Sequence, residues 1–197
     1  MKKYKFIKRL LDIILSYFGL IFAYIPMLII SLLIIIFDGT PVFFNQKRIG
    51  KDGKPFICYK FRTMHKDAPH NLSTKEFTDA QNYVSRIGKF LRRTSLDELP
   101  QLLNVLAGDM SIVGPRPLIP EEKELHQLRS CAGIYKTRPG ITGLAQICGR
   151  DNLSDKRKIE CDKIYNDNIS FLCDAKILCW TLSKIITADG IKAASDT

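Results

Sequence analysis

The chain has 197 residues and a net charge of +10, so it is long enough for one domain with its own core. Its six cysteines form no CxxC pair and no zinc-like spacing with the three histidines. This pattern argues against a zinc site or a disulfide framework and predicts reduced, mostly buried thiols. The positive charge is compatible with nucleic acid, anionic lipid or phosphorylated substrates.

The N-terminal segment is first basic and then almost uniformly apolar. The stretch from Leu10 to Phe37 carries Asp12 as its only formal charge. It exceeds the roughly 20 apolar residues that a spanning helix needs, and no signal-peptide cleavage site follows it. Basic residues flank both ends, and Pro26 lies near the middle. We therefore expect a helix that breaks at Pro26, enters one leaflet and returns, with a single spanning helix as the alternative.

Two aromatic-rich apolar runs follow, joined by a turn of glycines, lysines and an aspartate at 50–54. This pattern predicts a β-hairpin. Lys60 and Arg62 alternate onto one face at the end of its second strand, either as a solvated edge or as a phosphate-facing pair. The polar stretch 66–84 has no clear period and is predicted to be a loop with at most one helical turn.

Helices are predicted wherever apolar residues recur at helical spacing. A short amphipathic helix over 85–93 is expected to turn Ile87, Phe90 and Leu91 inward. The other expected helices cover 99–107, 120–128, 155–168 and 171–187. The predicted fold is mainly α with a small β-hairpin (α+β). Its expected parts are a basic, re-entrant membrane segment (1–40), a compact cytoplasmic catalytic domain (41–190) and a C-terminal tail (191–197).

An acidic pair, Asp97 and Glu98, stands at the start of the apolar helix that Gly108 can end. The helix begins either with a capping box from Ser95 to Glu98 or at Asp97, because Pro100 is tolerated only in the first turn. Capping a helix and complementing its dipole is the ordinary role of such a pair.

Two arginines precede prolines in turn-rich stretches. Arg116 lies between Pro115 and Pro117, and the following proline confines its ψ to extended values. A guanidinium held in this way suits a phosphate or carboxylate partner. Arg138 likewise precedes a proline, and Arg150 lies in a later turn.

Three motifs carry a resemblance to a known family. They are KFRTM at 60–64, LRRTSLDELPQLLNVLAGDMSIVGPRP at 91–117 and RPGITGLAQ at 138–146. The chain resembles the bacterial sugar transferases, specifically the small monotopic polyprenyl-phosphate phosphoglycosyl transferases of the PglC type. The resemblance extends from the N-terminus to about residue 190. It departs from the family's pattern at Ile25, where relatives usually have Ser, and at Cys148, where they commonly have Asn.

The resemblance implies an enzyme that moves a sugar 1-phosphate from a UDP-sugar to undecaprenyl phosphate and releases UMP, through a covalent aspartyl-phosphosugar intermediate. It also implies Mg²⁺, a re-entrant helix, and a place on the cytoplasmic face of the bacterial inner membrane. The reaction would be the first membrane step in making a glycoprotein, O-antigen or capsule.

Site residues are assigned by position in these motifs. The resemblance makes Asp97 the nucleophile and a metal ligand, and Glu98 its catalytic partner. It also matches Lys60, Arg92 and Arg116 to phosphate-binding residues, and Pro26 to the helix break. The full expected substrate-binding set is Lys60, Arg62, Arg92, Arg116, Arg138, Arg150 and Pro26.

Two other classes of function are weighed against the enzyme. A membrane-anchored, non-catalytic lipid-binding or scaffold protein would use the acidic pair only as a cap. Nucleic-acid binding is not expected, because much of the positive charge flanks the apolar segment, where lipid headgroups account for it. The sequence leaves open a homo-oligomer and does not identify the sugar.

Overall fold

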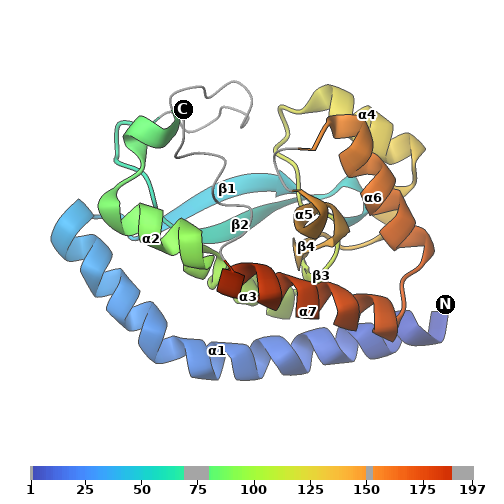
Figure 1. Cartoon of the computed structure of the whole chain (residues 1–197), viewed down its shortest axis with the longest axis horizontal. Helices are drawn as coiled ribbons and strands as arrows, with labels where there is room; N and C mark the ends of the chain where they lie inside the picture. Colours follow the sequence, from blue (N-terminus) through green and yellow to red (C-terminus); the bar gives the residue numbers. More distant parts are fainter. Residues whose placement is uncertain (1, 69–79, 150–152, 188–197) are drawn as a thin grey trace.

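The computed structural model describes residues 2–68, 80–149 and 153–187. These residues form mostly helices, with one antiparallel and one parallel pair of strands. The expected α+β class with a small hairpin is therefore confirmed. The N-terminal helix runs along one side of the molecule, and the other elements stack on it (Figure 1).

Helix α1 (Lys2–Asp38) is continuous, and Pro26 lies inside it. The expected break into two helices at Pro26 is therefore not seen. A proline removes only one backbone hydrogen bond, so a helix can continue through it with a bend. Figure 1 shows α1 bending along its length. The segment Tyr4–Asp38 is long and apolar enough to cross a membrane.

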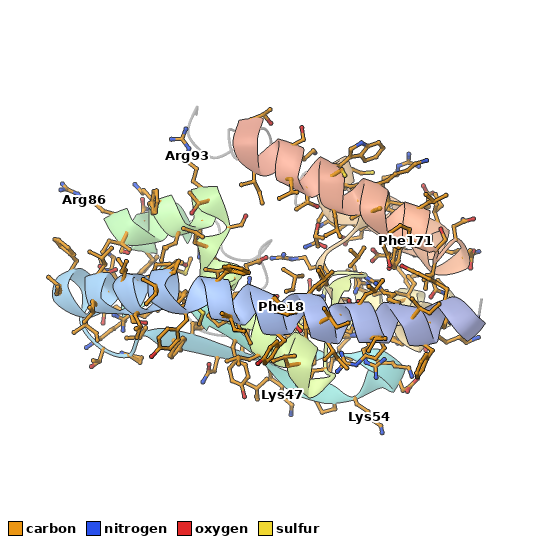
Figure 2. The ribbon with its side chains drawn as sticks, turned by 90° about the horizontal axis from the view of Figure 1, so that it is seen from below. Phe18, Lys47, Lys54, Arg86, Arg93 and Phe171 are labelled. Atoms are coloured by element: carbon orange, nitrogen blue, oxygen red, sulfur yellow. The ribbon has the colours of Figure 1, made fainter. Side chains whose placement is uncertain are left out.

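One stripe of α1 faces the rest of the protein. Its buried positions recur at helical spacing and are polar in the first half and apolar in the second: Lys8, Asp12, Ser16, Ala23, Ile30 and Ile34. The opposite face exposes large apolar side chains such as Phe22 and Phe37. Figure 2 shows Phe18 over the middle of α1, with basic side chains at the margins of the view, namely Lys47, Lys54, Arg86 and Arg93.

The polar half of this stripe makes specific bonds. Lys8 Nζ lies 2.8 Å from Asp174 Oδ2, and both side chains are buried. Asp12 Oδ1 accepts a hydrogen bond from the backbone N–H of Ile112 at 3.1 Å. Beside this stripe, the half-buried Arg9 donates to the carbonyl of Val105 at 2.7 Å. The apolar half packs with Phe61 and Leu91 in a shared cluster, so α1 completes the core.

Strands β1 (Phe43–Ile49) and β2 (Pro55–Phe61) form the expected antiparallel hairpin. Its turn contains a short 3₁₀ helix, η1 (Lys51–Gly53), in which Asp52 has a positive φ of 57°. In this register Arg48 is opposite Phe56, and Lys60 is opposite Phe44. Because paired residues share a face, Arg48 and Lys60 lie on the same side of the hairpin.

Helix α2 (Arg86–Thr94) matches the expected helix over 85–93, and Ser85 is its N-cap, since Ser85 Oγ accepts a hydrogen bond from Gly88 N at 2.9 Å. Gly88 is required by close approach, because a Cβ there would lie 1.9 Å from the carbonyl oxygen of Thr63. Phe90, expected inside, is 58% exposed. The helix ends at Ser95, which has a positive φ of 58°.

The acidic pair lies in a separate 3₁₀ turn, η3 (Leu96–Glu98), and helix α3 (Gln101–Ala107) starts only after Pro100. Ser95 makes no side-chain cap, so the capping box is not formed. Gly108 ends α3 with φ 96°, as expected.

The second half of the chain adds elements that the sequence pattern did not predict. Strands β3 (Ser111–Val113) and β4 (Gly140–Thr142) pair in parallel, and α5 (Leu144–Cys148) follows. The turn η4 (Ile134–Lys136) is a further short 3₁₀ element. Helix α4 (Lys123–Cys131) is the helix expected at 120–128, with a later start. Earlier in the chain, η2 (Ala80–Tyr83) is a helical turn within the expected loop 66–84.

The last two helices, α6 (Asp155–Asp167) and α7 (Phe171–Thr187), confirm their predictions. They pack around a cluster of buried side chains that includes Val113, Tyr165 and Ile177. All six cysteines, each within the described part of the chain, are unpaired, and only Cys58 and Cys161 are buried. The expectation of mostly buried thiols was therefore wrong.

Candidate active site

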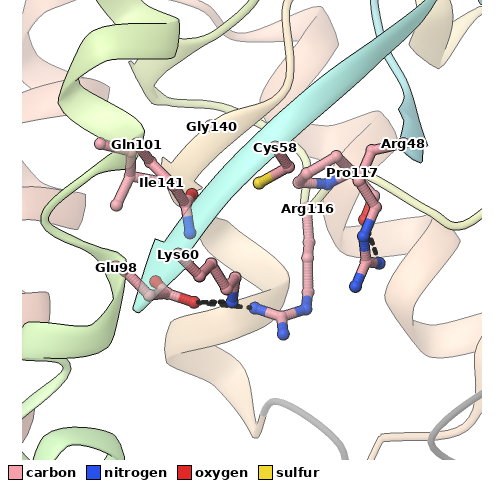
Figure 3. Close-up of a pocket in the computed structure, with 9 residues that line it drawn as sticks. All are labelled: Arg48, Cys58, Lys60, Glu98, Gln101, Arg116, Pro117, Gly140 and Ile141. Atoms are coloured by element: carbon pink, nitrogen blue, oxygen red, sulfur yellow. Dashed lines mark hydrogen bonds and ion pairs between the residues drawn. The ribbon is translucent and has the colours of Figure 1, made fainter. Parts of the chain in front are cut away.

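A cavity of about 240 Å³, counting the part that opens to solvent, lies between the hairpin, η3 and the loop after β3. Figure 3 shows its lining residues: Arg48, Cys58, Lys60, Glu98, Gln101, Arg116, Pro117, Gly140 and Ile141. Three of these side chains are cations and one is a carboxylate. The cavity is therefore suited to an anion.

Glu98 forms ion pairs with two of the cations that line the cavity. Its Oε1 lies 2.7 Å from Lys60 Nζ and 3.7 Å from Arg116 Nη1 (Figure 3). The structure thus brings together three of the predicted site residues from β2, η3 and the loop after β3. One carboxylate oxygen holds both cations on the same side of the cavity.

Asp97 lies beside the cavity and does not line it. It is 9% exposed, and no hydrogen bond reaches its carboxylate from the residues the structure describes. Burial raises the pKa of Asp97, Lys60 opposes that rise, and Glu98 adds to it. Arg92 and Arg116 oppose it further. The pKa of Asp97 is therefore raised overall, the surrounding cations limit the rise, and no hydrogen bond from the described residues occupies its carboxylate oxygens.

The turn geometry gives the two acids different surroundings. A 3₁₀ helix has three residues per turn, so neighbouring side chains point about 120° apart. The left-handed conformation of Ser95 turns the chain sharply between α2 and η3. Asp97 is buried within reach of the charges of Lys60, Arg92 and Arg116, whereas Glu98 lines the cavity.

Asn104 fixes β2, and with it Lys60, against α3. Its Oδ1 accepts from the N–H of Tyr59 at 3.1 Å, and its Nδ2 donates to the carbonyl of Ile57 at 2.7 Å. Asn104 is fully buried. The side-chain amide of Asn104 thus forms hydrogen bonds with backbone groups on the edge of β2 that is not paired with β1.

Replacing Asn104 by Leu should destabilise the protein by about 1–3 kcal/mol for each backbone group left unpaired, because Tyr59 N–H and Ile57 C=O would lose their partner. Thermal unfolding of the purified protein measures this loss. Leu103, which is 45% exposed on the same helix, offers a matched control as Leu103→Asn. Equal stability of the two variants would contradict the assigned role.

Arg48 is a cavity residue that the sequence analysis did not identify. Its Nη1 donates to the carbonyl of Pro117 at 3.0 Å, and its Nη2 donates to Gln46 Oε1. Burial and the neighbouring Arg116 together lower the pKa of Arg48 to about 10. Two guanidinium groups held close together indicate a site for more than one negative charge.

Two more cavity residues, Cys58 and Gln101, were also missed. Burial raises the pKa of the Cys58 thiol, with Lys60 and Arg48 opposing it. Cys58 therefore lines the cavity as a small, mostly protonated side chain. Gln101 is 3% exposed. The available signal for Gln101 was a pair of amides, with Asn104, three residues apart in an otherwise apolar helix.

Arg62 and Arg138, predicted to bind substrate, lie elsewhere. Arg62 follows the end of β2, and its Nη2 donates to the carbonyls of Asp38 and Gly39 at the end of α1. Arg138 Nε donates to the carbonyl of Gly108 at 2.7 Å, just after α3. Both guanidinium groups satisfy carbonyls that a helix end leaves without partners, where positive charge is also favoured by the helix dipole.

The remaining predicted residues are dispersed. Arg92 donates from Nε to Thr63 Oγ1 at 2.9 Å and lies on the Asp97 side of the site. Pro26 is inside α1 and outside the cavity. Arg150 lies outside the described residues.

Comparison with known proteins identifies the family. The family model for bacterial sugar transferases matches residues 3–188. The chain is 43% identical to the uncharacterized sugar transferase EpsL of Bacillus subtilis, over 94% of this chain and 90% of EpsL.

Two longer relatives have more specific names. A UDP-glucose:undecaprenyl-phosphate glucose-1-phosphate transferase of Klebsiella pneumoniae is 42% identical over 90% of this chain and 39% of its own length. An undecaprenyl-phosphate galactose phosphotransferase of Salmonella typhimurium is 36% identical over 94% of this chain and 42% of its own length. Matching nearly end to end, the chain belongs to the bacterial sugar transferase family.

Proposed function

We propose that this protein transfers a sugar 1-phosphate from a UDP-sugar to undecaprenyl phosphate and releases UMP. The observation that carries the proposal is the cavity in which Arg48, Lys60 and Arg116 surround Glu98, with Asp97 buried beside it. The relatives from Klebsiella pneumoniae and Salmonella typhimurium, named for transfer to undecaprenyl phosphate, support the same acceptor.

The three cations would bind the diphosphate of the donor. Arginine binds phosphate oxygens with two parallel N–H groups, whereas lysine acts as a compact point charge. The Arg116 guanidinium lies between Lys60, which contacts Glu98, and the Arg48 guanidinium (Figure 3). Charge that develops on the transferring phosphoryl group is stabilised by cations fixed in place before the reaction.

Asp97 would act as the nucleophile in two displacements. In the first, an Asp97 carboxylate oxygen attacks the phosphorus that carries the sugar, and the bond from that phosphorus to the oxygen of UMP breaks. In the second, a phosphate oxygen of undecaprenyl phosphate attacks the same phosphorus, and the bond to Asp97 breaks. The products are UMP and the diphosphate-linked lipid sugar, and Asp97 is regenerated.

Glu98 suits a different role from Asp97. Its carboxylate is engaged with Lys60 at 2.7 Å and with Arg116 at 3.7 Å, which reduces its availability as a nucleophile. By holding both cations, it keeps them on the side of the cavity where the phosphates would bind. We therefore propose that Glu98 orients Lys60 and Arg116 for phosphate binding.

The acidic pair also fits Mg²⁺. This ion is usually held by one or two carboxylates together with substrate phosphates and water. Asp97 and Glu98 supply such carboxylates, and within the described ranges no larger cluster of acidic, His or Cys side chains could hold a metal alone. Bound there with the donor, the ion would neutralise charge on the phosphates.

Membrane attachment through α1 would bring the site to its lipid substrate. The outward face of α1 is apolar, and basic side chains lie at the margins of the same view (Figure 2). Lysine and arginine favour the cytoplasmic side and anionic headgroups. We place the protein at the cytoplasmic face of the bacterial inner membrane, and the bend of the continuous helix α1 would let it enter one leaflet and return to the same side (Figure 1).

The test is UMP release by purified protein in detergent, with undecaprenyl phosphate and a panel of UDP-sugars. One donor should give UMP in proportion to lipid-linked product, and EDTA should stop the reaction until Mg²⁺ is restored. Absence of UMP with every donor, from folded protein, would favour a non-catalytic membrane-anchored scaffold instead.

A further inference from the structure

The loop that carries Arg116 is held by an unusual set of hydrogen bonds. The four consecutive carbonyls of residues 115–118 each accept one, in chain order from Gly140 N at 2.9 Å, Arg129 Nη1 at 2.6 Å, Arg48 Nη1 at 3.0 Å and Ile49 N at 2.9 Å. Two donors are backbone groups of β4 and β1, and two are guanidinium groups.

The composition of the loop explains why side chains are needed. Pro115 and Pro117 have no N–H, so this segment cannot form a regular ladder with a neighbouring strand. Its position depends on its carbonyls. The carbonyl of Arg116 itself is bound by Arg129, a residue that lies outside the cavity.

Arg129 is in turn held by a buried ion pair. Its Nη2 lies 2.7 Å from Asp162 Oδ2 on α6, and the two side chains are 4% and 1% exposed. Burial raises the pKa of Asp162 to about 6 even though the neighbouring Arg129 opposes the rise. Removing two charges from water is costly, and an apolar pair of similar volume is often as stable. Stability alone therefore does not explain this pair.

We propose that Arg129, held by Asp162, is a positioning residue that fixes the main chain at Arg116 and thereby directs the Arg116 guanidinium toward Glu98 and the donor phosphates. This inference rests on the proposed function and adds two residues to it. Arg129 and Asp162 touch neither Glu98 nor Lys60 in the described structure, so their effect must pass through the loop.

The competing explanation is that the ion pair only joins α4 to α6. The two explanations differ in how the pair is coupled to Arg116. A purely structural pair would affect the enzyme equally with or without the Arg116 side chain. A positioning pair would have no effect once that side chain is gone.

The experiment is a double-mutant cycle in UMP release. The paired variant Arg129→Met with Asp162→Leu removes both charges and the donor to Arg116. It should lower kcat/KM by about 10- to 100-fold in the wild-type background, because small misplacements of a catalytic group cost this much. In the Arg116→Ala background the same pair should cause no further loss.

Lys8→Gln is the matched control. It also removes the cation of a buried ion pair, the one with Asp174, but Lys8 has no bond to the Arg116 loop. Its effect on kcat/KM should be small and equal in both backgrounds. Thermal unfolding in detergent shows whether each variant is folded.

A full loss that persists in the Arg116→Ala background would overturn the inference, as would wild-type activity of the paired variant. If the paired variant does not fold, Asp162→Asn replaces it, with a smaller loss expected that again requires Arg116. The same double-mutant cycle can be measured as dissociation constants for UDP, which do not depend on turnover. A wild-type protein that binds UDP but releases no UMP would count against the proposed function. The double-mutant cycle could then still be measured through the dissociation constants for UDP.

Discussion

Replacing Asp97 by Asn should lower kcat for UMP release by about 10³-fold or more, since a residue that bears the covalent intermediate cannot be replaced by a neutral amide. The fold should not suffer. Burial raises the pKa of Asp97, so above that pKa its ionised form costs the folded protein stability, which a neutral side chain does not. We therefore expect an inactive variant that unfolds at the same temperature as the wild type or higher.

A trapping measurement identifies the nucleophile directly. Wild-type protein incubated with sugar-labelled donor, but without lipid acceptor, should retain the label after denaturation, and Asp97→Asn should not. Asp52→Asn is the matched control, because Asp52 is an exposed turn residue with a positive φ that Asn tolerates. Label retained by Asp97→Asn would transfer the nucleophilic role to another group, with Glu98 the first to examine.

Replacing Arg116 by Ala should lower kcat/KM by about 10²- to 10³-fold, the usual loss when one preorganised group that stabilises developing charge is removed. Arg116→Lys should recover only part of this activity, because lysine keeps the charge but not the two parallel N–H groups. Steady-state kinetics with the preferred donor measure both effects.

Lys54→Ala is the control for Arg116. Lys54 is an exposed cation beyond the hairpin turn, so its loss changes the net charge equally without changing the cavity. Equal losses from Arg116→Ala and Lys54→Ala would mean that overall charge, and not the position of Arg116, determines the rate.

Helical spacing was sufficient to predict most helices, and the glycine-rich turn was sufficient for the hairpin. Its register was not predictable, because the turn contains a 3₁₀ segment in which Asp52 has a positive φ. A slip of one residue would move every side chain to the other face. Without the register, Arg48 could not be placed on the same face as Lys60, and so it was missed. The parallel pairing of β3 with β4 depends on contacts distant in the chain and left no local signal.

The structure brings some of the predicted site residues together at the cavity, and it places two predicted arginines elsewhere, where each donates to backbone carbonyls. Lys60, Glu98 and Arg116 meet at the cavity as expected. Arg62 was expected to follow Lys60 along the strand, but β2 ends at Phe61 and Arg62 caps α1 instead. Both Arg116 and Arg138 precede prolines, yet only Arg116 faces the cavity. The ψ restriction from a following proline predicts that the backbone of the arginine is fixed. It does not predict which group the arginine side chain binds.

The polar stripe of α1 has a consequence for how such proteins diverge. Lys8 is bound to Asp174 on α7, and Asp12 to the backbone of β3, across most of the length of the chain. An N-terminal helix taken from a distant relative would bring a cation or carboxylate without its partner into a buried position. Substitutions at residues 8 and 174 should therefore be inherited together, and the helix should evolve at the pace of the catalytic core and not as an exchangeable anchor.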